Sequence, residues 1–83
     1  MPDPVSWLLI EEGWRVVSVE GDHLGHVTAV DAEAERDIFD GIEYRHLFFE
    51  HVRYVPSEQV AVIFEGEVRL SLTADEAHRL PPV

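Results

Sequence analysis

Short runs of β-branched and aromatic residues, separated by turn-forming residues, recur along most of the chain. Four of these runs have the length and composition of strands: residues 14–19, 24–30, 42–49 and 52–55. Turn-forming residues at 20–22 separate the first two runs, and Pro56 ends the fourth because proline cannot donate to a strand ladder. Residues 5–12 fit either one helical turn or a short extended cover, and Trp7 and Trp14 are predicted to cover the core.

The clearest local pattern is a hairpin near the C-terminus. Two apolar runs, residues 60–64 and 67–72, lie on either side of a glycine-containing turn. In the second run Val68, Leu70 and Leu72 alternate with polar residues, which predicts one buried face and one face in contact with water.

A capping box follows the hairpin. Thr73 and Glu76 have the spacing at which each side chain pairs with the backbone N–H of the other. This predicts a short helix that reaches about Leu80, where Pro81 ends it. About six short strands followed by one short helix are typical of a small all-β barrel of the SH3-like kind.

Residues 31–40 have a different composition, with five acidic residues and one arginine, Arg36. The acidic residues are Asp31, Glu33, Glu35, Asp37 and Asp40. Because the segment leads into a turn dipeptide at residues 40–41, it is predicted to be an exposed acidic loop that Ile38 and Phe39 anchor to the core. Three interpretations of the acidic residues stay open: solubility, adaptation to a salty cytoplasm, or a face for a basic partner.

The charge of the chain narrows the choice of partners. The 83 residues fit a single domain spanning residues 1–83, and 17 acidic residues against six arginines give a formal charge of −11. DNA, RNA and anionic membranes are recognised through basic side chains, so the charge argues against direct binding of any of them. We therefore expect a protein partner, and the acidic residues would favour a basic one.

Two residue types are absent from the sequence. The lack of cysteine excludes disulfides, zinc–thiolate sites and thiol catalysis, and the lack of lysine excludes a P-loop lysine and Schiff-base chemistry. No apolar run approaches the ~18 residues of a transmembrane helix, and the start of the chain lacks the pattern of a signal peptide. We therefore expect a cytoplasmic protein.

Histidine is the residue type most suggestive of a site. Four of the five histidines are candidate metal ligands: His23, His26, His46 and His51. In a strand, residues three apart point to opposite faces, so His23 and His26 converge only if a turn or a bulge redirects one of them. Gly25 lies between them and is typical of a bulge or a close backbone approach, and Asp22 could add a carboxylate to two imidazoles, a ligand set that suits transition metals. The alternative is that the histidines are solvated or half-buried strand residues, and on this interpretation we expect no metal and no cofactor.

The remaining polar residues do not form a catalytic pattern. The serines lack a G-x-S-x-G context, and the acidic pairs fit turns, caps and solvent-exposed positions. A general-acid pair needs one carboxyl in an apolar pocket, and the pattern marks none. We expect no catalytic residue and no enzymatic activity.

Four motifs occur in an order that resembles the PRC-barrel family. They are residues 13–17 (GWRVV), 19–27 (VEGDHLGHV), 54–60 (YVPSEQV) and the glycine-led strand at residues 66–70 (GEVRL). The resemblance covers roughly residues 13–72, and residues 37–41 are similar to a loop of small stand-alone bacterial members. The family is named for a barrel in a reaction-centre subunit, and a related barrel forms the C-terminal half of the ribosome-maturation factor RimM. It implies a PRC-type barrel that serves as an adaptor or assembly module without catalytic residues.

We therefore expect a non-enzymatic protein-interaction or assembly module that is a homo-oligomer, with a dimer as the expected form and Trp7 or Phe49 in its interface. The alternative is a RimM-like accessory of ribosome or RNA processing that acts through a basic ribosomal protein. The chain lacks RimM's N-terminal domain and is strongly acidic, which argues against that alternative. A third hypothesis, a metal-dependent enzyme, requires the four candidate histidines to cluster.

Overall fold

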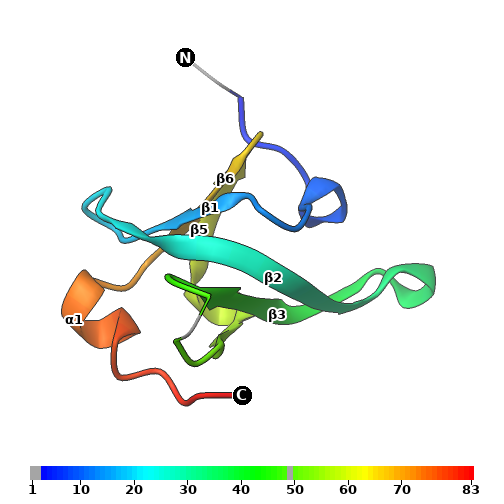
Figure 1. Ribbon diagram of the computed structural model, residues 1–83. Coiled ribbons are helices and arrows are strands. Elements are labelled where there is room, and N and C mark those ends of the chain that lie inside the picture. Colours follow the sequence, from blue (N-terminus) through cyan, green and yellow to red (C-terminus); the bar gives the residue numbers. More distant parts are fainter. Residues whose placement is uncertain (1–2, 49) are drawn as a thin grey trace.

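Six strands form one sheet in the computed structural model, which describes residues 3–48 and 50–83 (Figure 1). The strands are β1 (Arg15–Val17), β2 (His23–Glu33), β3 (Ile38–Arg45), β4 (Arg53–Pro56), β5 (Val60–Phe64) and β6 (Glu67–Leu70). Their order in the sheet is β4-β3-β2-β1-β6-β5, with β1 parallel to β6 and the other neighbours antiparallel. The predicted all-β class with six strands is confirmed.

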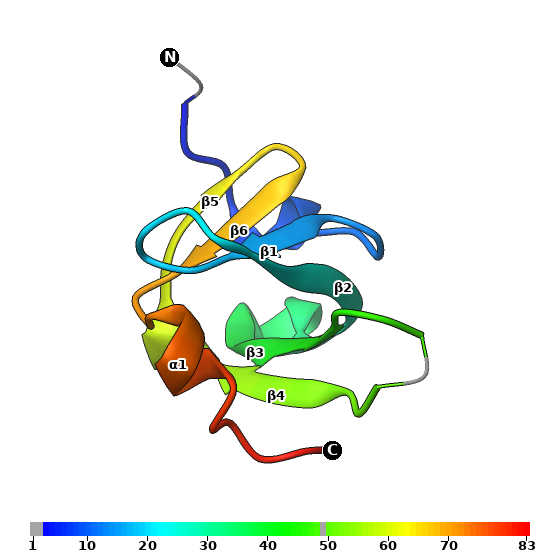
Figure 2. The ribbon, with the colours of Figure 1, turned by 60° about the vertical axis from the view of Figure 1, so that its left-hand side comes forward.

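The sheet is curled into a half-barrel. In Figure 2, β5, β6 and β1 lie above β3 and β4, and β2 passes from one layer to the other. The interior holds apolar side chains from every part of the sheet, and five of them have no exposed surface: Val16, Ile42, Val55, Val68 and Leu70. Along β6 the buried Val68 and Leu70 alternate with the less buried Glu67 and Arg69, which is the pattern of a strand with one buried face.

The C-terminal hairpin and helix follow the sequence closely. β5 pairs with β6 in a register that places Ile63 opposite Val68, and Leu72 packs against the core beyond the end of β6. The capping box is present: the Thr73 hydroxyl accepts from the Glu76 backbone N–H at 3.2 Å, and the Thr73 N–H donates to the Glu76 carboxylate at 3.0 Å.

The helix that this capping box begins, α1 (Ala74–Ala77), is shorter than predicted. Beyond Ala77 the chain continues to Leu80 in tighter turns, in which the Arg79 N–H donates to the Glu76 carbonyl at 3.1 Å and the Leu80 N–H donates to the Ala77 carbonyl at 3.2 Å. Pro81 then disfavours a helical conformation at Leu80. Ala77 is fully buried at the end of the half-barrel. Within the described residues, no helix is long and apolar enough to cross a membrane.

The acidic segment is a hairpin rather than a loop. β2 continues to Glu33 and β3 begins at Ile38, so a single 3₁₀ turn, η2 (Ala34–Arg36), connects the strands. The predicted turn at residues 40–41 is wrong, because Gly41 pairs with Asp31 of β2 on one side and with Pro56 of β4 on the other. Pairing on both sides overrides the local turn preference of the dipeptide.

The predicted anchors of this segment behave differently from each other. Ile38 is 40% exposed, so it does not anchor the hairpin. Phe39 does, because its ring stacks on Trp7 with the centroids 5.4 Å apart and the planes 8° from parallel. Trp7 lies in the 3₁₀ turn η1 (Trp7–Leu9), and both Trp7 and Trp14 are partly buried against the core, as predicted.

β3 ends earlier than its sequence pattern predicts. The pairing of β2 with β3 stops at His26 and Arg45, so His46 and Phe48 lie beyond the strand and are exposed. The backbone of Gly25 packs against Arg45 and His46 at this point, and the chain turns away toward β4. Phe49, which the sequence placed in this strand and in a dimer interface, lies outside the described residues.

Both edges of the sheet are met by the ends of the chain. At the β5 edge the Val5 N–H donates to the Ile63 carbonyl at 2.8 Å. At the β4 edge Arg53 forms a bridge with Pro82, and the Val83 N–H donates to the Val52 carbonyl at 2.7 Å. Covered edges offer fewer free backbone groups for pairing with another chain.

Candidate functional site

Tyr54 marks the centre of an acidic surface on the outer side of β3 and β4. It lies opposite Glu43 in the β3–β4 ladder, and its hydroxyl donates to the Asp40 carbonyl at 2.9 Å. The phenol reaches that carbonyl by lying across Gly41, where a Cβ would come within 2.9 Å of the Tyr54 oxygen. Glycine at position 41 is therefore required for Tyr54 to lie flat on the strand.

Four carboxylates surround this tyrosine. Partial burial raises the pKa of the Tyr54 hydroxyl, and the negative charges of four acidic residues raise it further. In order of effect these residues are Asp40, Asp31, Glu58 and Glu43. We call Asp31, Asp40, Glu43 and Glu58 the acidic face.

Two members of the acidic face form a direct pair. Asp31 lies opposite Gly41 in the ladder and Glu43 lies opposite Ala29, so the two carboxyls are diagonal neighbours on one side of the sheet. A hydrogen bond between the two carboxyl groups raises the pKa of Glu43, with burial and the charge of Asp31 acting in the same direction. Neighbouring carboxylates repel, and a cation placed against them would relieve that repulsion.

The five acidic residues predicted as a partner face fall into two groups. Asp31 and Asp40 belong to the acidic face, whereas the other three lie exposed at or next to the hairpin turn: Glu33, Glu35 and Asp37. At this hairpin tip Arg36 pairs with Glu33 at 3.4 Å on an open surface, where such a pair adds little stability. Figure 1 shows the hairpin extending to the side of the molecule opposite α1.

Glu43 and Glu58 were missed by sequence reasoning. Strand alternation alone places Glu43 on the same side of β3 as Gly41, but it does not show that Asp31 of β2 is adjacent. Glu58 lies in the 3₁₀ turn η3 (Ser57–Gln59) after β4, and its proximity to Tyr54 depends on how that turn packs.

The histidines lie at the other end of β2 and β3. A tight turn after β1 delivers His23: the buried Ser18 hydroxyl accepts from the N–H groups of Glu20 and Asp22, at 3.2 and 3.0 Å, and Gly21 adopts φ of 92°. Glycine takes this left-handed conformation without the steric cost of a side chain. The turn therefore fixes where β2 begins.

A bulge at the start of β2 brings two of the histidines together. The register between β1 and β2 shifts where Val16 and Val17 face Gly25 and His23, so His23 and His26 are both exposed. Their ring centroids are 5.0 Å apart, and the His23 and His46 centroids are 5.9 Å apart. Burial lowers the pKa of His23, and the charges of His26, His46 and Arg15 lower it further.

This histidine cluster does not include the fourth candidate, His51. Within residues 3–48 and 50–83, no three histidine or acidic side chains are arranged to hold a metal ion. His51 instead lies with His46 and His78 in the lining of a pocket, so the four candidates do not converge on one point.

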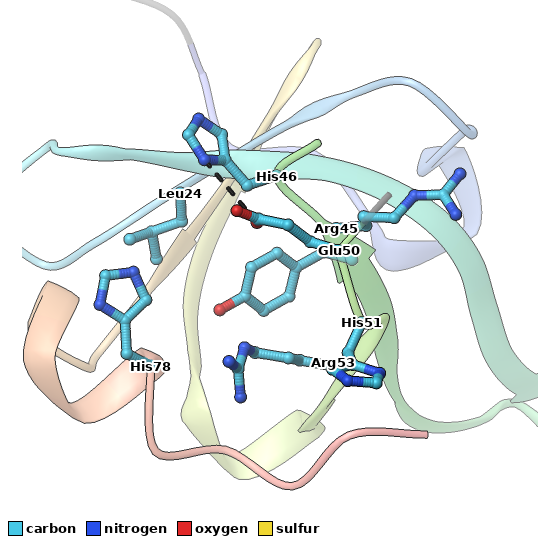
Figure 3. Close-up of a pocket in the computed structure, with 8 residues that line it drawn as sticks. Leu24, Arg45, His46, Glu50, His51, Arg53 and His78 are labelled. Carbon is cyan, nitrogen blue, oxygen red and sulfur yellow. Dashed lines mark ion pairs between the residues drawn. The ribbon is translucent and has the colours of Figure 1, made fainter. Parts of the chain in front are cut away.

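The pocket has a volume of about 410 Å³ and lies between β2, β3, β4 and the segment after α1 (Figure 3). Its lining residues are Leu24, Tyr44, Arg45, His46, Glu50, His51, Arg53 and His78. The Tyr44 hydroxyl donates to the Ala77 carbonyl at 3.4 Å, and Arg53 donates to the Leu80 carbonyl at 2.7 Å. His46 pairs with Glu50 at 3.9 Å. The pocket therefore contains guanidinium and imidazole groups, and Tyr44 and Arg53 connect its lining to Ala77 and Leu80.

Comparison of the chain with protein-family models, with curated proteins and with solved structures finds no match.

Proposed function

We propose that the protein is a non-enzymatic protein-interaction or assembly module that binds a basic protein through its acidic face. The observation that carries the proposal is the diagonal placement of Asp31 and Glu43 across β2 and β3 on the outside of the sheet, where the proximity of Asp31 raises the pKa of Glu43. Two carboxyl groups held together at a surface cost free energy in the isolated protein, and a cationic side chain would offset that cost.

Arginine is the partner residue that best suits the acidic face. Its planar guanidinium can donate two parallel hydrogen bonds to a carboxylate, and it stacks on aromatic rings. Tyr54 provides a ring beside the carboxylates of Asp40 and Glu43, so one arginine could contact both kinds of group. The hairpin tip adds exposed negative charge that would accelerate the approach of a basic partner.

The sequence resemblance to the PRC-barrel family supports an adaptor role. The RimM-like alternative is a special case of the same proposal, in which the basic partner is a ribosomal protein. Genes for ribosomal proteins or for tRNA modification beside the gene for this chain would favour that case. We further propose a cytoplasmic location, which the cysteine-free composition supports.

We also propose that the module forms a homodimer through the surface around η1. Leu8 and Leu9 are each 56% exposed, and they adjoin Trp7, which lines an apolar groove of about 380 Å³ with Phe39 and Val62. Exposed leucines beside such a groove are typical of a contact surface. Sedimentation equilibrium should give the dimer mass for the native chain and the monomer mass for the Leu8→Ser/Leu9→Ser variant, whereas a monomer at high protein concentration would exclude the dimer.

The test of the acidic face uses an arginine-rich peptide as the probe and compares three neutralised variants. The face variant carries Asp31→Asn and Glu43→Gln, the tip variant carries Glu33→Gln, Glu35→Gln and Asp37→Asn, and the control carries Glu11→Gln and Glu12→Gln. All of the tip and control positions are exposed. Association and dissociation rates are measured by surface plasmon resonance at several salt concentrations.

The face variant should dissociate about tenfold faster, because it loses the charge-assisted hydrogen bonds. The tip variant should associate more slowly, and this difference should vanish as salt shortens the Debye length below about 8 Å. The control should match the native chain. Equal losses in all three variants would mean that net charge alone attracts the peptide, and the acidic face would have no specific role.

A further inference from the structure

All five histidines lie at the same end of the folded molecule, although they come from distant parts of the sequence. His23, His26 and His46 form the ring cluster, and His46, His51 and His78 line the pocket. Two of the six arginines line the same pocket. Among the described lining residues, Arg45 and Arg53 oppose the carboxylate of Glu50, so the formal charge is +1 with neutral histidines and +4 with all three protonated. The lining of this pocket is therefore cationic in a chain of charge −11.

The directions of the side chains show which groups share the pocket space. In Figure 3 Arg53 and His78 project toward the same space from opposite sides, the Glu50 carboxylate points toward His46, and the Arg45 guanidinium points away from the others. The cationic groups that share this space are therefore Arg53 and His78.

Arg53 is held in place by a hydrogen bond that occupies only part of its guanidinium group. One terminal nitrogen donates to the Leu80 carbonyl at 2.7 Å, which fixes the guanidinium at the base of the pocket next to the Tyr44 hydroxyl. A guanidinium has five N–H donors, so most of its donors remain for a ligand. His51 and His78 stand on separate elements, the β3–β4 connection and the end of α1, and each is exposed.

We propose that this pocket binds a phosphate group carried by a small anionic molecule. A tetrahedral dianion accepts hydrogen bonds in several directions at once, which matches donors that approach one space from β4 and from the end of α1. A volume of about 410 Å³ is within the range of small-ligand sites. The site is separate from the acidic face, and its test does not depend on the proposed protein partner.

Binding should strengthen as the pH falls. Histidine is the side-chain type that can gain positive charge between pH 8 and pH 5, so an anion held against imidazole groups is expected to bind more tightly at low pH. The other charged groups that line the pocket are Glu50, Arg53 and Arg45, whose guanidinium points away, and the cluster formed by His23 and His26 adjoins the pocket through His46. Glu50 would compete with a bound anion for His46, because its carboxylate lies 3.9 Å from the His46 Nδ1.

The experiment titrates the native chain with inorganic phosphate, sulfate and acetate, and follows the imidazole and backbone signals by NMR. Sulfate keeps its charge between pH 5.5 and pH 8, so its pH dependence reports on the histidines alone. We expect phosphate and sulfate to shift the signals of His51, Arg53 and His78, with sulfate binding about tenfold tighter at pH 5.5 than at pH 8. Acetate binding as tightly as phosphate would overturn the assignment of a tetrahedral dianion.

Four variants sharpen the test. His78→Asn and Arg53→Gln should each weaken phosphate binding about tenfold at pH 6, because each removes a charged donor. Glu50→Gln should strengthen it about threefold, because a competing like charge is lost. The control, Arg36→Gln, removes a positive charge at the hairpin tip and should leave binding unchanged. Arg53→Gln also removes a contact to Leu80 and could unfold the protein for that reason. In that case His78→Asn, at an exposed position, still tests the site. Equal weakening by Arg36→Gln and His78→Asn, or no saturable shift with phosphate, would overturn the proposal.

Discussion

The acidic face and the histidine end are built on the same two strands, yet they carry opposite charge. Along β2, His23 and His26 give way to Asp31, and along β3, Glu43 is followed by Arg45 just before His46. The two regions are therefore only a few residues apart in sequence, and they lie at different positions along the β2–β3 ladder, which pairs His26 with Arg45 at one end and Asp31 with Gly41 farther along. The net charge of −11 belongs to the whole chain and does not describe the local charge of either region.

A close backbone approach supports each region. At the histidine end a Cβ on Gly25 would lie 2.5 Å from the Arg45 carbonyl oxygen and 2.9 Å from the His46 Cα. At the acidic face a Cβ on Gly41 would overlap the Val55 carbonyl oxygen and press on the Tyr54 hydroxyl. Each glycine lets its own region pack tightly, so each region can be perturbed by itself.

The largest expected effect is the unfolding of the whole domain, which would abolish both regions together. Leu70 is fully buried in the core that both regions share, and Leu70→Asp would place an unpaired carboxylate there. The cost exceeds about 4 kcal/mol, which is most of the stability of a small domain. Circular dichroism at room temperature should show an unfolded chain. A folded Leu70→Asp protein with the native spectrum would mean that the assigned strand register is wrong.

Gly25→Ala and Gly41→Ala should separate the two regions. Each substitution forces the backbone of a neighbouring strand to move, at a cost of about 1–3 kcal/mol in the free energy of unfolding. Urea unfolding measures the cost, and backbone NMR shifts locate it. Gly25→Ala should disturb the signals around His23 and His46, and Gly41→Ala those around Tyr54. If either substitution disturbed both regions equally, they would not be independent.

Glu43→Gln should stabilise the protein at neutral pH. The pKa of Glu43 in the folded state is raised above its ordinary value of 4.5, so the favourable contribution of its protonated form is fully present below pH 4.5 and is lost as pH rises through the folded pKa. Glutamine removes the repulsion of Asp31, which is worth about 0.5 kcal/mol after screening by solvent. The gain should appear at pH 7 and disappear below pH 4.5 in thermal unfolding. A loss of stability at pH 7 would contradict the assigned pair.

The smallest expected effect concerns His23. Its folded pKa is lowered from 6.5, so the folded state binds fewer protons than the unfolded state. The stability that comes from neutral His23 is fully present above pH 6.5 and is lost as pH falls through the lowered pKa. His23→Asn should therefore reduce the drop in melting temperature between pH 7.5 and pH 5.5. An unchanged drop would show that the His23 cluster does not titrate as described.

The parts of the fold that the sequence predicts well are those set by local chemistry. The capping box of Thr73 and Glu76, the alternation that buries Val68 and Leu70, and the bulge next to Gly25 all depend on residues close together in the chain. Residues 31–40 show the opposite case. Their acidic composition and turn dipeptide indicate a loop, but pairing with the rest of β2 and with β4 extends the strands through them.

The sites depend on longer-range contacts. Glu43 and Asp31 meet only because of the register of β2 against β3, and His78 reaches the pocket only because α1 packs on the end of the half-barrel. No local pattern reports either contact. The histidines could be recognised as candidates from the sequence, whereas their division into a ring cluster and a pocket lining could not.

The central claim is that the acidic face, and not the net charge, is recognised. The most direct test is a titration of the ¹⁵N-labelled native chain with a tetra-arginine peptide, followed by backbone NMR at moderate salt. The account predicts shifts confined to the acidic face and Tyr54, and none at remote exposed acids such as Glu11, Glu12 and Asp75. Shifts spread evenly over all exposed acidic residues would contradict it.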